Sequence, residues 1–323
     1  MRQFLTVPIE FQVCMEALFI FLGVIFVLFI IYVGITVSLF RFAILRKDDV
    51  EKKDRWLFKK PGFSLHGDKG KDAVRQFEIA PFETVTITSF DGIKLSAFLL
   101  PAENPKGTVI LFHGFHSTPK WDFAASFPYF SALGMNLLYP IQRAHGISEG
   151  KFITYGIKER KDAVAWTEFV NGRYGVEKPL YLGGISMGCT TVLMGSGEGY
   201  PKNVQGIIAD CGFLSPHGIF TEVMRKSGLP PAPFVWLFGI LCKRIAGFDI
   251  DEYSVFEALK HTDIPIAFIH GEHDRLIPCK MTLRAHDSYK GKKFLLTVKN
   301  ATHGVAYLHG KAEYEAVLKL LFN

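Results

Sequence analysis

The sequence predicts an α/β protein in which a mostly parallel sheet of eight strands has helices on both faces, carries a helical cap insertion and follows one transmembrane helix. Short apolar segments rich in β-branched residues alternate with helix-length segments over residues 84–323, and this alternation is typical of a parallel sheet covered on both faces. A long uncharged segment near the N-terminus predicts the transmembrane helix. About fifty residues lie between the expected strands 206–210 and 265–270, which is too many for one crossover helix, and this excess predicts the cap.

The transmembrane helix is expected over residues 17–40, a 24-residue stretch without a charge in which 20 residues are hydrophobic. At a rise of about 1.5 Å per residue, this length crosses a hydrocarbon core of about 30 Å. A cleaved signal peptide would have a shorter apolar run of about 7–15 residues. A buried helix of a soluble domain is disfavoured because all faces of this stretch are equally apolar. We therefore expect a permanent anchor, preceded by a short tail (1–16).

A basic juxtamembrane linker is expected over residues 41–80. Its first twenty residues contain eight bases and four acids, whereas Arg2 is the only base before the span. The positive-inside rule then places the following domain in the cytoplasm. The bases are Arg41, Arg46, Lys47, Lys52, Lys53, Arg55, Lys59 and Lys60.

Most of the formal net charge of +6 comes from this linker. The remaining bases are too dispersed for a surface that follows a phosphate backbone, so nucleic acid is not an expected partner. The five cysteines are odd in number and lack C-x-x-C spacing, which favours reduced thiols and argues against a zinc site.

The α/β domain is expected over residues 81–323. Its first two strands should form a hairpin, because Asp91 and Gly92 lie between them and Asp-Gly is a strong turn signal. The expected strands are residues 84–89, 93–99, 108–112, 136–139, 180–184, 206–210, 265–270 and 293–298. The expected helices lie near residues 121–133, 157–170, 187–197, 279–288 and 310–322.

The cap insertion is expected at about residues 213–258, above the carboxyl edge of the sheet, where open α/β sheets bind ligands. It contains the aromatic run 234–238 (FVWLF). These side chains could line a pocket for an acyl group, or they could pack under the cap or against a membrane surface. The sequence leaves both possibilities open.

A candidate nucleophile lies in residues 184–188 (GISMG), between an apolar strand and a helix. Glycines on both sides of Ser186 permit the tight turn between strand and helix, and such a turn exposes the serine hydroxyl at the sheet edge. The adjacent helix N-terminus favours negative charge there. This context indicates a catalytic serine.

A serine nucleophile needs a base, and the base needs an orienting group. His303 is the candidate base, because it lies in the loop between the last strand and the last helix. Asp274 is the candidate acid, because it lies just after the 265–270 strand. Two alternatives remain open for the acid: Asp210, at the end of the preceding strand, and Glu272, near Asp274 in sequence.

Two backbone amides should form an oxyanion hole. One is the N–H of Met187, the residue after the nucleophile. The other is the N–H of Phe115, in the loop that follows the 108–112 strand. In the same loop, His113 is expected to make structural hydrogen bonds and His116 to be solvated or to face substrate.

Together these residues resemble the α/β-hydrolase superfamily over about residues 84–323, and the chain order of Ser186, Asp274 and His303 is that of the superfamily. Residues 142–150 (QRAHGISEG) resemble a segment that follows the fourth strand in many members, with Ala144 in place of a usual glycine. The resemblance implies no cofactor and no metal. It also implies structural roles for Arg143, Glu149 and Asp162, and it points to bacterial members, some of which carry an N-terminal anchor.

The expected activity is hydrolysis of a carboxylic ester or thioester by a Ser-His-Asp triad through an acyl-enzyme, with an apolar acyl substrate. A serine at this position argues against the branches of the superfamily that use aspartate, such as haloalkane dehalogenases and epoxide hydrolases. The alternatives are a peptidase of the prolyl-oligopeptidase-like branch and a non-catalytic binding protein with a hydrolase fold.

Overall fold

The structure is a computed structural model that describes residues 9–47 and 68–323. It contains an eight-stranded sheet in the order β1-β2-β4-β3-β5-β6-β7-β8. Each predicted strand is present, and its ends differ from the prediction by two residues or fewer. The strands are β1 (Glu83–Thr88), β2 (Lys94–Leu100), β3 (Thr108–Phe112), β4 (Asn136–Pro140), β5 (Leu180–Ile185), β6 (Val204–Asp210), β7 (Ile266–Gly271) and β8 (Lys293–Val298).

The sheet is mostly parallel, as predicted. Strands β1 and β2 form the expected antiparallel hairpin, and β2 also pairs antiparallel with β4, whereas the remaining neighbours run parallel. Gly92 has φ +84° in the hairpin turn, a conformation that glycine adopts without strain. Every residue of β3, β4, β5 and β7 is buried, because helices cover both faces of these strands.

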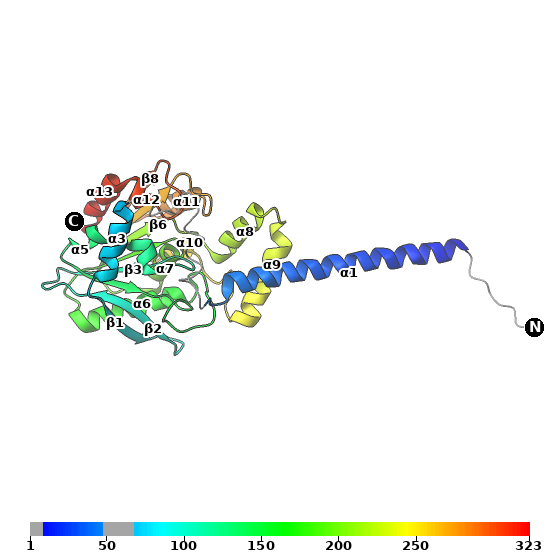
Figure 1. The fold of residues 1–323 in the computed structure, drawn as a ribbon, viewed down its shortest axis with the longest axis horizontal. Helices are drawn as coiled ribbons and strands as arrows, with labels where there is room; N and C mark the ends of the chain where they lie inside the picture. Colours follow the sequence, from blue (N-terminus) through cyan, green and yellow to red (C-terminus); the bar gives the residue numbers. More distant parts are fainter. Residues whose placement is uncertain (1–8, 48–67) are drawn as a thin grey trace, which may run out of the picture.

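Two hydrophobic cores lie on opposite faces of the sheet. Helices α6, α7 and the cap contribute to one core, and α3, α4, α5 and α13 contribute to the other (Figure 1). The helices are α3 (Asp68–Ile79), α4 (Pro119–Phe123), α5 (Phe127–Ser131), α6 (Glu159–Tyr174), α7 (Met187–Gly195), α11 (Lys280–Ser288), α12 (Ala306–His309) and α13 (Lys311–Phe322), with a short 3-10 turn η1 (Ser196–Glu198).

The helix predicted over residues 121–133 is divided into α4 and α5. Pro128 lies in the first turn of α5 and has no N–H to donate to the carbonyl of Ala124, so a continuous helix would lose a hydrogen bond there. The sequence interpretation overlooked this proline.

The N-terminal helix α1 spans Ile9–Ile44 and therefore extends the predicted 17–40 segment at both ends. It is a single helix long and apolar enough to cross a membrane by length and composition. In Figure 1 it leaves the domain on one side, and its C-terminal turns lie against the domain, where Phe40 and Ile44 are buried.

The predicted linker over residues 41–80 is helical at both ends. Its first residues complete α1, and residues 68–79 form α3, whose Phe77 is buried in one of the two cores. The middle of the predicted linker lies outside the described residues, together with five of its bases: Lys52, Lys53, Arg55, Lys59 and Lys60.

The cap consists of α8 (Pro216–Lys226), α9 (Pro231–Leu241), a π-helical turn η2 (Cys242–Ala246) and α10 (Val255–Ala258). It follows the carboxyl end of β6, as predicted. Ser215 caps the N-terminus of α8, and its side chain accepts a hydrogen bond from the N–H of Gly218. Helices α8 and α9 lie at the end of the domain from which α1 emerges (Figure 1).

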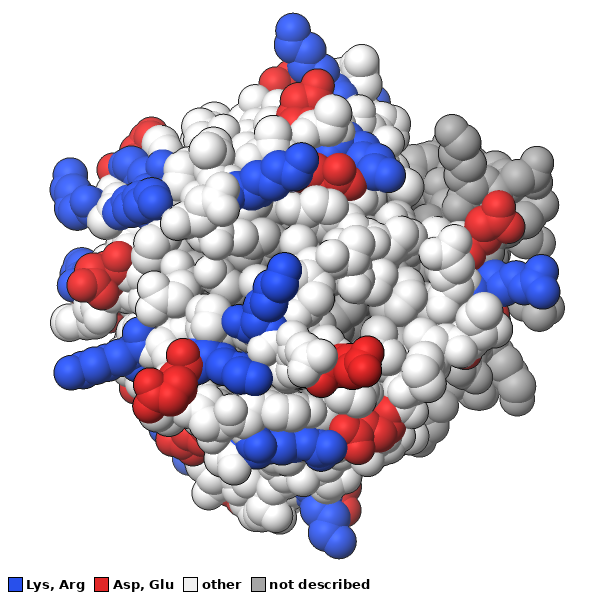
Figure 2. All heavy atoms as spheres, turned by 90° about the vertical axis from the view of Figure 1, so that its left-hand side faces the viewer, with Lys and Arg blue, Asp and Glu red and all other residues white. Residues whose placement is uncertain are grey.

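The face of the domain opposite α1 carries lysine and arginine side chains mixed with acidic ones (Figure 2). No band of one charge runs across that face. This distribution is typical of a solvated surface.

Candidate active site

Ser186 occupies the turn between β5 and α7 and has φ 57° and ψ −117°. Because positive φ is unusual for a residue with a side chain, this conformation is strained. Two backbone hydrogen bonds hold it: the N–H of Ser186 donates to the carbonyl of Asp210 at 2.9 Å, and the N–H of Thr190 donates to the carbonyl of Ser186 at 3.1 Å. The turn therefore fixes the serine hydroxyl beyond the carboxyl end of β5.

Glycines make this turn possible. A Cβ at Gly188 would lie 1.9 Å from the carbonyl oxygen of Phe112, and a Cβ at Gly184 would lie 2.2 Å from the carbonyl carbon of Gly188. Strand β3, the turn and the first residues of α7 thus approach one another too closely for any side chain.

His303 lies in the loop between β8 and α12, as predicted. The hydroxyl of Ser186 donates to Nε2 of His303 at 2.9 Å, and Nδ1 of His303 donates to Oδ2 of Asp274 at 2.6 Å. The structure thus brings together the three predicted residues, which come from three loops at one edge of the sheet.

Asp274 is buried just beyond β7 and its two oxygens have different partners. Oδ1 accepts hydrogen bonds from the N–H groups of Leu276 and Ile277 at 2.8 and 2.9 Å. Oδ2 accepts from His303 and also from Nε2 of His270, at 3.1 Å. Burial alone would raise the pKa of Asp274, but hydrogen bonds from His270 and His303 outweigh it and hold the pKa well below the usual range. The carboxylate is therefore ionised at neutral pH.

His270 was not assigned a role from the sequence. It is fully buried in β7, and its Nδ1 accepts a hydrogen bond from the hydroxyl of Thr282 at 2.7 Å. This contact fixes the tautomer in which Nε2 carries the proton, which is shared between Oδ2 of Asp274 at 3.1 Å and the carbonyl of Ile277 at 2.9 Å. The only indication in the sequence was its position four residues before Asp274. A histidine that merely packs in the core could occupy the same position.

Neither alternative acid contacts His303 by a hydrogen bond among the described residues. The carboxylate of Asp210 accepts a hydrogen bond from the hydroxyl of Tyr314 at 3.1 Å. Glu272 is exposed and accepts from the hydroxyl of Thr297 at 3.0 Å. The geometry favours Asp274 as the group that orients His303.

The buried carboxyl of Asp210 should make stability depend on pH. Burial raises its pKa to about 6, although His270 and the hydrogen bond from Tyr314 act in the opposite direction. Since an unfolded aspartate has a pKa of about 3.9, the folded protein binds more protons than the unfolded chain between about pH 4 and pH 6. The free energy of unfolding therefore loses up to about 3 kcal/mol through this group as pH rises across that window.

Asp210→Asn should remove this loss. We expect the melting temperature of the variant, relative to the unsubstituted protein, to increase from pH 4 to pH 7 when both are followed by thermal unfolding. Parallel pH profiles for the two proteins would contradict the assignment.

The loop after β3 lies beside the nucleophile. A Cβ at Gly114 would be 3.3 Å from the Cβ of Ser186, and the N–H of Gly114 donates to Oδ2 of Asp122 at 2.6 Å. The N–H groups of Phe115 and Met187, the predicted oxyanion donors, have no acceptor within residues 9–47 and 68–323. Free N–H donors in segments that adjoin the nucleophile are what an oxyanion hole requires.

Hydrogen bonds that involve His113, Gln142 and His145 hold this loop in place. His113 is fully buried, and burial lowers its pKa to about 3, so the ring is neutral. Its Nε2 accepts from the N–H of Gln142 at 3.1 Å, and Nε2 of His145 accepts from the N–H of His116 at 3.0 Å. The structural role expected for His113 agrees with these contacts. His116 is half-buried, and its ring stacks on Phe115 at 3.8 Å.

The three residues that the resemblance assigns to structure make polar contacts, which are buried between Arg143 and Asp162 and exposed at Glu149. Arg143 pairs with Asp162, with Nε and Oδ2 2.7 Å apart, and with Asp91 at 2.9 Å. Glu149 accepts from the N–H of Lys94 at 2.8 Å. Ala144, which replaces the usual glycine, has φ +60°, a conformation in which glycine would be unstrained.

One group of potential metal ligands occurs at this site, where the ligand atoms of Cys211, Asp274 and His303 lie within 4.8 Å of one another. The donor atoms of the latter two are already used in hydrogen bonds with each other and with Ser186. Burial raises the pKa of the Cys211 thiol well above its ordinary value, and a protonated thiol is a poor ligand. The donor set therefore fits a hydrogen-bonded site better than a metal centre.

The cap aromatics pack in two directions. Phe238 contacts Phe220 with ring centroids 4.3 Å apart, and it also contacts Phe40 of α1 at 5.9 Å. A cavity of about 550 Å³ lies between α8 and α9, with Val235 and Trp236 in its wall. None of its lining residues belongs to the Ser186 site. The contact of these rings with α1 was not foreseen from the sequence.

No protein-family model matches the sequence. The chain is 25% identical over 256 residues to the Bacillus subtilis (strain 168) protein YqkD, covering 78% of this chain and 83% of that protein. It is 24% identical over 252 residues to YfhR of Escherichia coli O157:H7, covering 75% and 81% of the two chains.

Solved structures with the same architecture include esterases. The Pyrococcus furiosus esterase Pf2001 superposes with a TM-score of 0.61 at 22% identity, covering 78% of this chain and 92% of the esterase. Est1E from Butyrivibrio proteoclasticus, solved with ferulic acid bound, superposes with a TM-score of 0.57 at 20% identity, covering 74% and 98%. The chain therefore has the α/β-hydrolase fold, as the sequence predicted.

Proposed function

We propose that the chain is a serine hydrolase that cleaves a carboxylic ester or thioester through an acyl-enzyme formed on Ser186. The observation that carries the proposal is the hydrogen-bonded series from the Ser186 hydroxyl through His303 to Asp274, with distances of 2.9 and 2.6 Å. Such a series is the arrangement of an activated nucleophile, its base and the group that orients the base. Esterases among the structural neighbours support the same class of substrate.

In the first half of the reaction, Nε2 of His303 takes the proton of Ser186 as Oγ attacks the carbonyl carbon. The ionised carboxylate of Asp274 holds Nδ1–H and stabilises the imidazolium that forms. The N–H groups of Phe115 and Met187 donate to the oxygen that becomes negatively charged.

In the second half, the imidazolium gives its proton to the departing alkoxide or thiolate, and the acyl group remains on Oγ. Water then gives a proton to His303 and attacks the acyl carbon, and the proton returns to Ser186 as the acid leaves. Protons balance over the cycle, and the mechanism requires no cofactor.

We also propose that α1 anchors the enzyme in a membrane, with the catalytic domain on the cytoplasmic side. The length and apolar composition of α1 support the anchor. The excess of bases after residue 40 supports the orientation.

A fluorophosphonate probe tests the nucleophile directly, because it reacts with an activated serine. The full chain in detergent or nanodiscs should be labelled on Ser186 and should hydrolyse a short p-nitrophenyl ester. Ser186→Ala should lose both properties, whereas Ser131→Ala, which alters an exposed serine on α5, should keep them. A preparation that turns over the ester without labelling, or equal labelling of Ser186→Ala, would show that another mechanism operates.

A further inference from the structure

Helix α1 does more than lead into the domain, since its C-terminal turns pack directly on cap helix α9. The hydroxyl of Tyr32 donates to the carbonyl of Pro233 at 2.6 Å, and the Tyr32 and Phe234 rings meet edge-on at 5.0 Å. Phe40 and Phe238 make a second ring contact two turns further along α1. Helix α9 therefore lies beside the part of α1 between residues 32 and 40.

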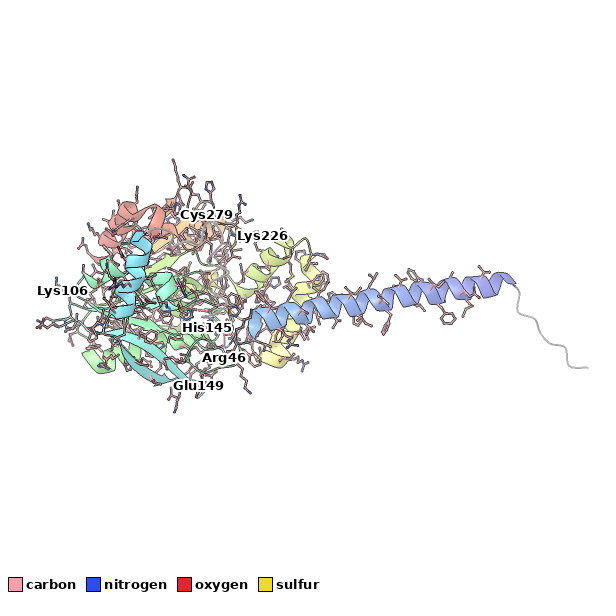
Figure 3. All side chains as sticks on the ribbon, in the orientation of Figure 1. Arg46, Lys106, His145, Glu149, Lys226 and Cys279 are labelled. Carbon is pink, nitrogen blue, oxygen red and sulfur yellow. The ribbon has the colours of Figure 1, made fainter. Side chains whose placement is uncertain are left out.

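The end of α1 is also fixed to the loop before α6. The N–H of Ile153 donates to the carbonyl of Ile44 at 2.8 Å, and the N–H of Arg46 donates to the carbonyl of Lys151 at 2.9 Å. The Arg46 guanidinium also donates to the carbonyls of Gly146 and Ser148, and it lies with His145 at the base of α1 (Figure 3). These contacts fix the position of the domain along the axis of α1.

This position along α1 places α9 at the membrane. Between Glu16 and the first contact with α9, the freely exposed apolar part of α1 is residues 17–31, which extends about 22 Å at the rise of an α-helix. A hydrocarbon core is about 30 Å thick. The missing length must come from the next turns, beginning at Tyr32, and these are the turns against which α9 packs.

The exposed residues of α9 and η2 have the composition that such a position requires. Trp236 is 66% exposed, and Pro233, Ile240 and Ile245 are exposed as well. Two bases, Lys243 and Arg244, follow in η2. Tryptophan and flanking bases are typical of the boundary between acyl chains and headgroups. In Figure 1, α9 runs across α1, at the edge of the domain from which the free part of α1 continues.

We propose that α9 and η2 form a membrane-docking surface (Pro233, Trp236, Ile240 and Ile245) that lies in the cytoplasmic boundary of the bilayer spanned by α1. The inference rests on the proposed membrane anchor. The surface holds the cap, and with it the active site, against the lipid.

The docking surface also indicates where the substrate comes from. A continuous series of aromatic rings leads from Phe238 to the predicted oxyanion loop through Phe220, Tyr155 and Phe115, with centroid separations of 4.3, 4.7 and 5.4 Å. Phe238, Phe220 and Tyr155 are buried in the core beneath the cap, so this series connects the cap with the predicted oxyanion loop through apolar packing. Because the docking surface places the cap at the bilayer boundary, the substrate of the proposed hydrolase is an ester whose acyl chain resides in the membrane.

Lipid quenching of Trp236 tests the docking surface. The full chain is reconstituted into phosphatidylcholine vesicles with or without dibrominated acyl chains, and Trp236→Phe is measured in parallel so that the difference isolates Trp236. We expect brominated lipid to remove most of the Trp236 emission. In the control Trp236→Phe/Lys106→Trp, the exposed tryptophan lies at the end of the domain away from α1 (Figure 3). Its emission should resist brominated lipid and respond to aqueous iodide.

Two results would overturn the docking surface: Trp236 emission that only iodide quenches, which places it in water, or emission that neither agent quenches, which indicates a protein partner such as a second copy. Flotation and carbonate extraction of the same vesicles report separately on the anchor. A protein that floats but shows no lipid quenching refutes the docking surface and leaves the proposed anchor intact.

Charge substitutions test the source of the substrate. Ile240→Glu and Ile245→Glu should each lower turnover of a long-chain ester embedded in vesicles about fivefold. A carboxylate is unfavourable in the apolar boundary, so the docking surface would separate from the lipid. Turnover of soluble p-nitrophenyl acetate should not change. Val176→Glu, at an exposed apolar residue before β5, should change neither. If the vesicle ester and the soluble ester respond equally, the substrate does not enter from the bilayer, whatever the labelling of Ser186 shows.

Discussion

Replacing Asp274 by asparagine is expected to lower kcat for a short p-nitrophenyl ester by about 10³–10⁴ while the protein stays folded. Oδ1 of Asp274 accepts from two backbone N–H groups, those of Leu276 and Ile277. The asparagine oxygen should keep these bonds, so its NH₂ group must face His303. His303 would then accept at Nδ1 and carry its proton on Nε2, where it cannot act as a base toward Ser186.

The matched control for this variant is Asp210→Asn. It removes a second buried carboxylate near the site, but this carboxylate is bonded to Tyr314 and not to His303. Its kcat should stay within about tenfold of the unsubstituted protein, since it does not fix the tautomer of the base. For Asp274→Asn the loss should fall on kcat more than on KM. A large loss in Asp210→Asn with activity retained in Asp274→Asn would reverse the two roles.

The positions of the site residues could be predicted because they depend on local patterns. Parallel strands end at one edge of the sheet, so residues in the loops after β5, β7 and β8 meet there even though Ser186 and His303 are 117 residues apart. The glycines around Ser186 identify the turn, and the positions of Asp274 and His303 after apolar strands identify their loops.

The contact between α1 and the cap could not be predicted, for a physical reason. Phe40 and Phe238 are apolar whether they face lipid, a pocket or each other, so composition does not distinguish these surroundings. His270 was missed for a similar reason, because a buried histidine in a strand reveals its partner only when Asp274 is placed beside it. Helix α3 was not predicted, because it is mostly polar and Phe77 alone was too weak an indication of a helix packed on the domain.

Gly188→Ala is expected to destabilise the fold by about 3 kcal/mol or more, or to prevent folding altogether. The new Cβ would lie 1.9 Å from the carbonyl oxygen of Phe112 and 2.7 Å from that of His113. Both atoms belong to the backbone, so no side-chain rotation can relieve the contact. Relief would require β3 to move away from β5, with which it pairs along its whole length, or would displace the loop that carries Phe115.

Thermal unfolding of the full chain in detergent measures this effect, with Gly172→Ala as the control. Gly172 is exposed inside α6, and a Cβ there would meet no atom within 4 Å. Alanine should therefore raise stability by about 0.5–1 kcal/mol, because glycine loses more conformational freedom on folding. Gly188→Ala should melt about 10 °C lower than the unsubstituted protein, if it folds. A melting temperature like that of Gly172→Ala would mean that β3 and α7 can separate without cost, and that the turn around Ser186 is not held by this close approach.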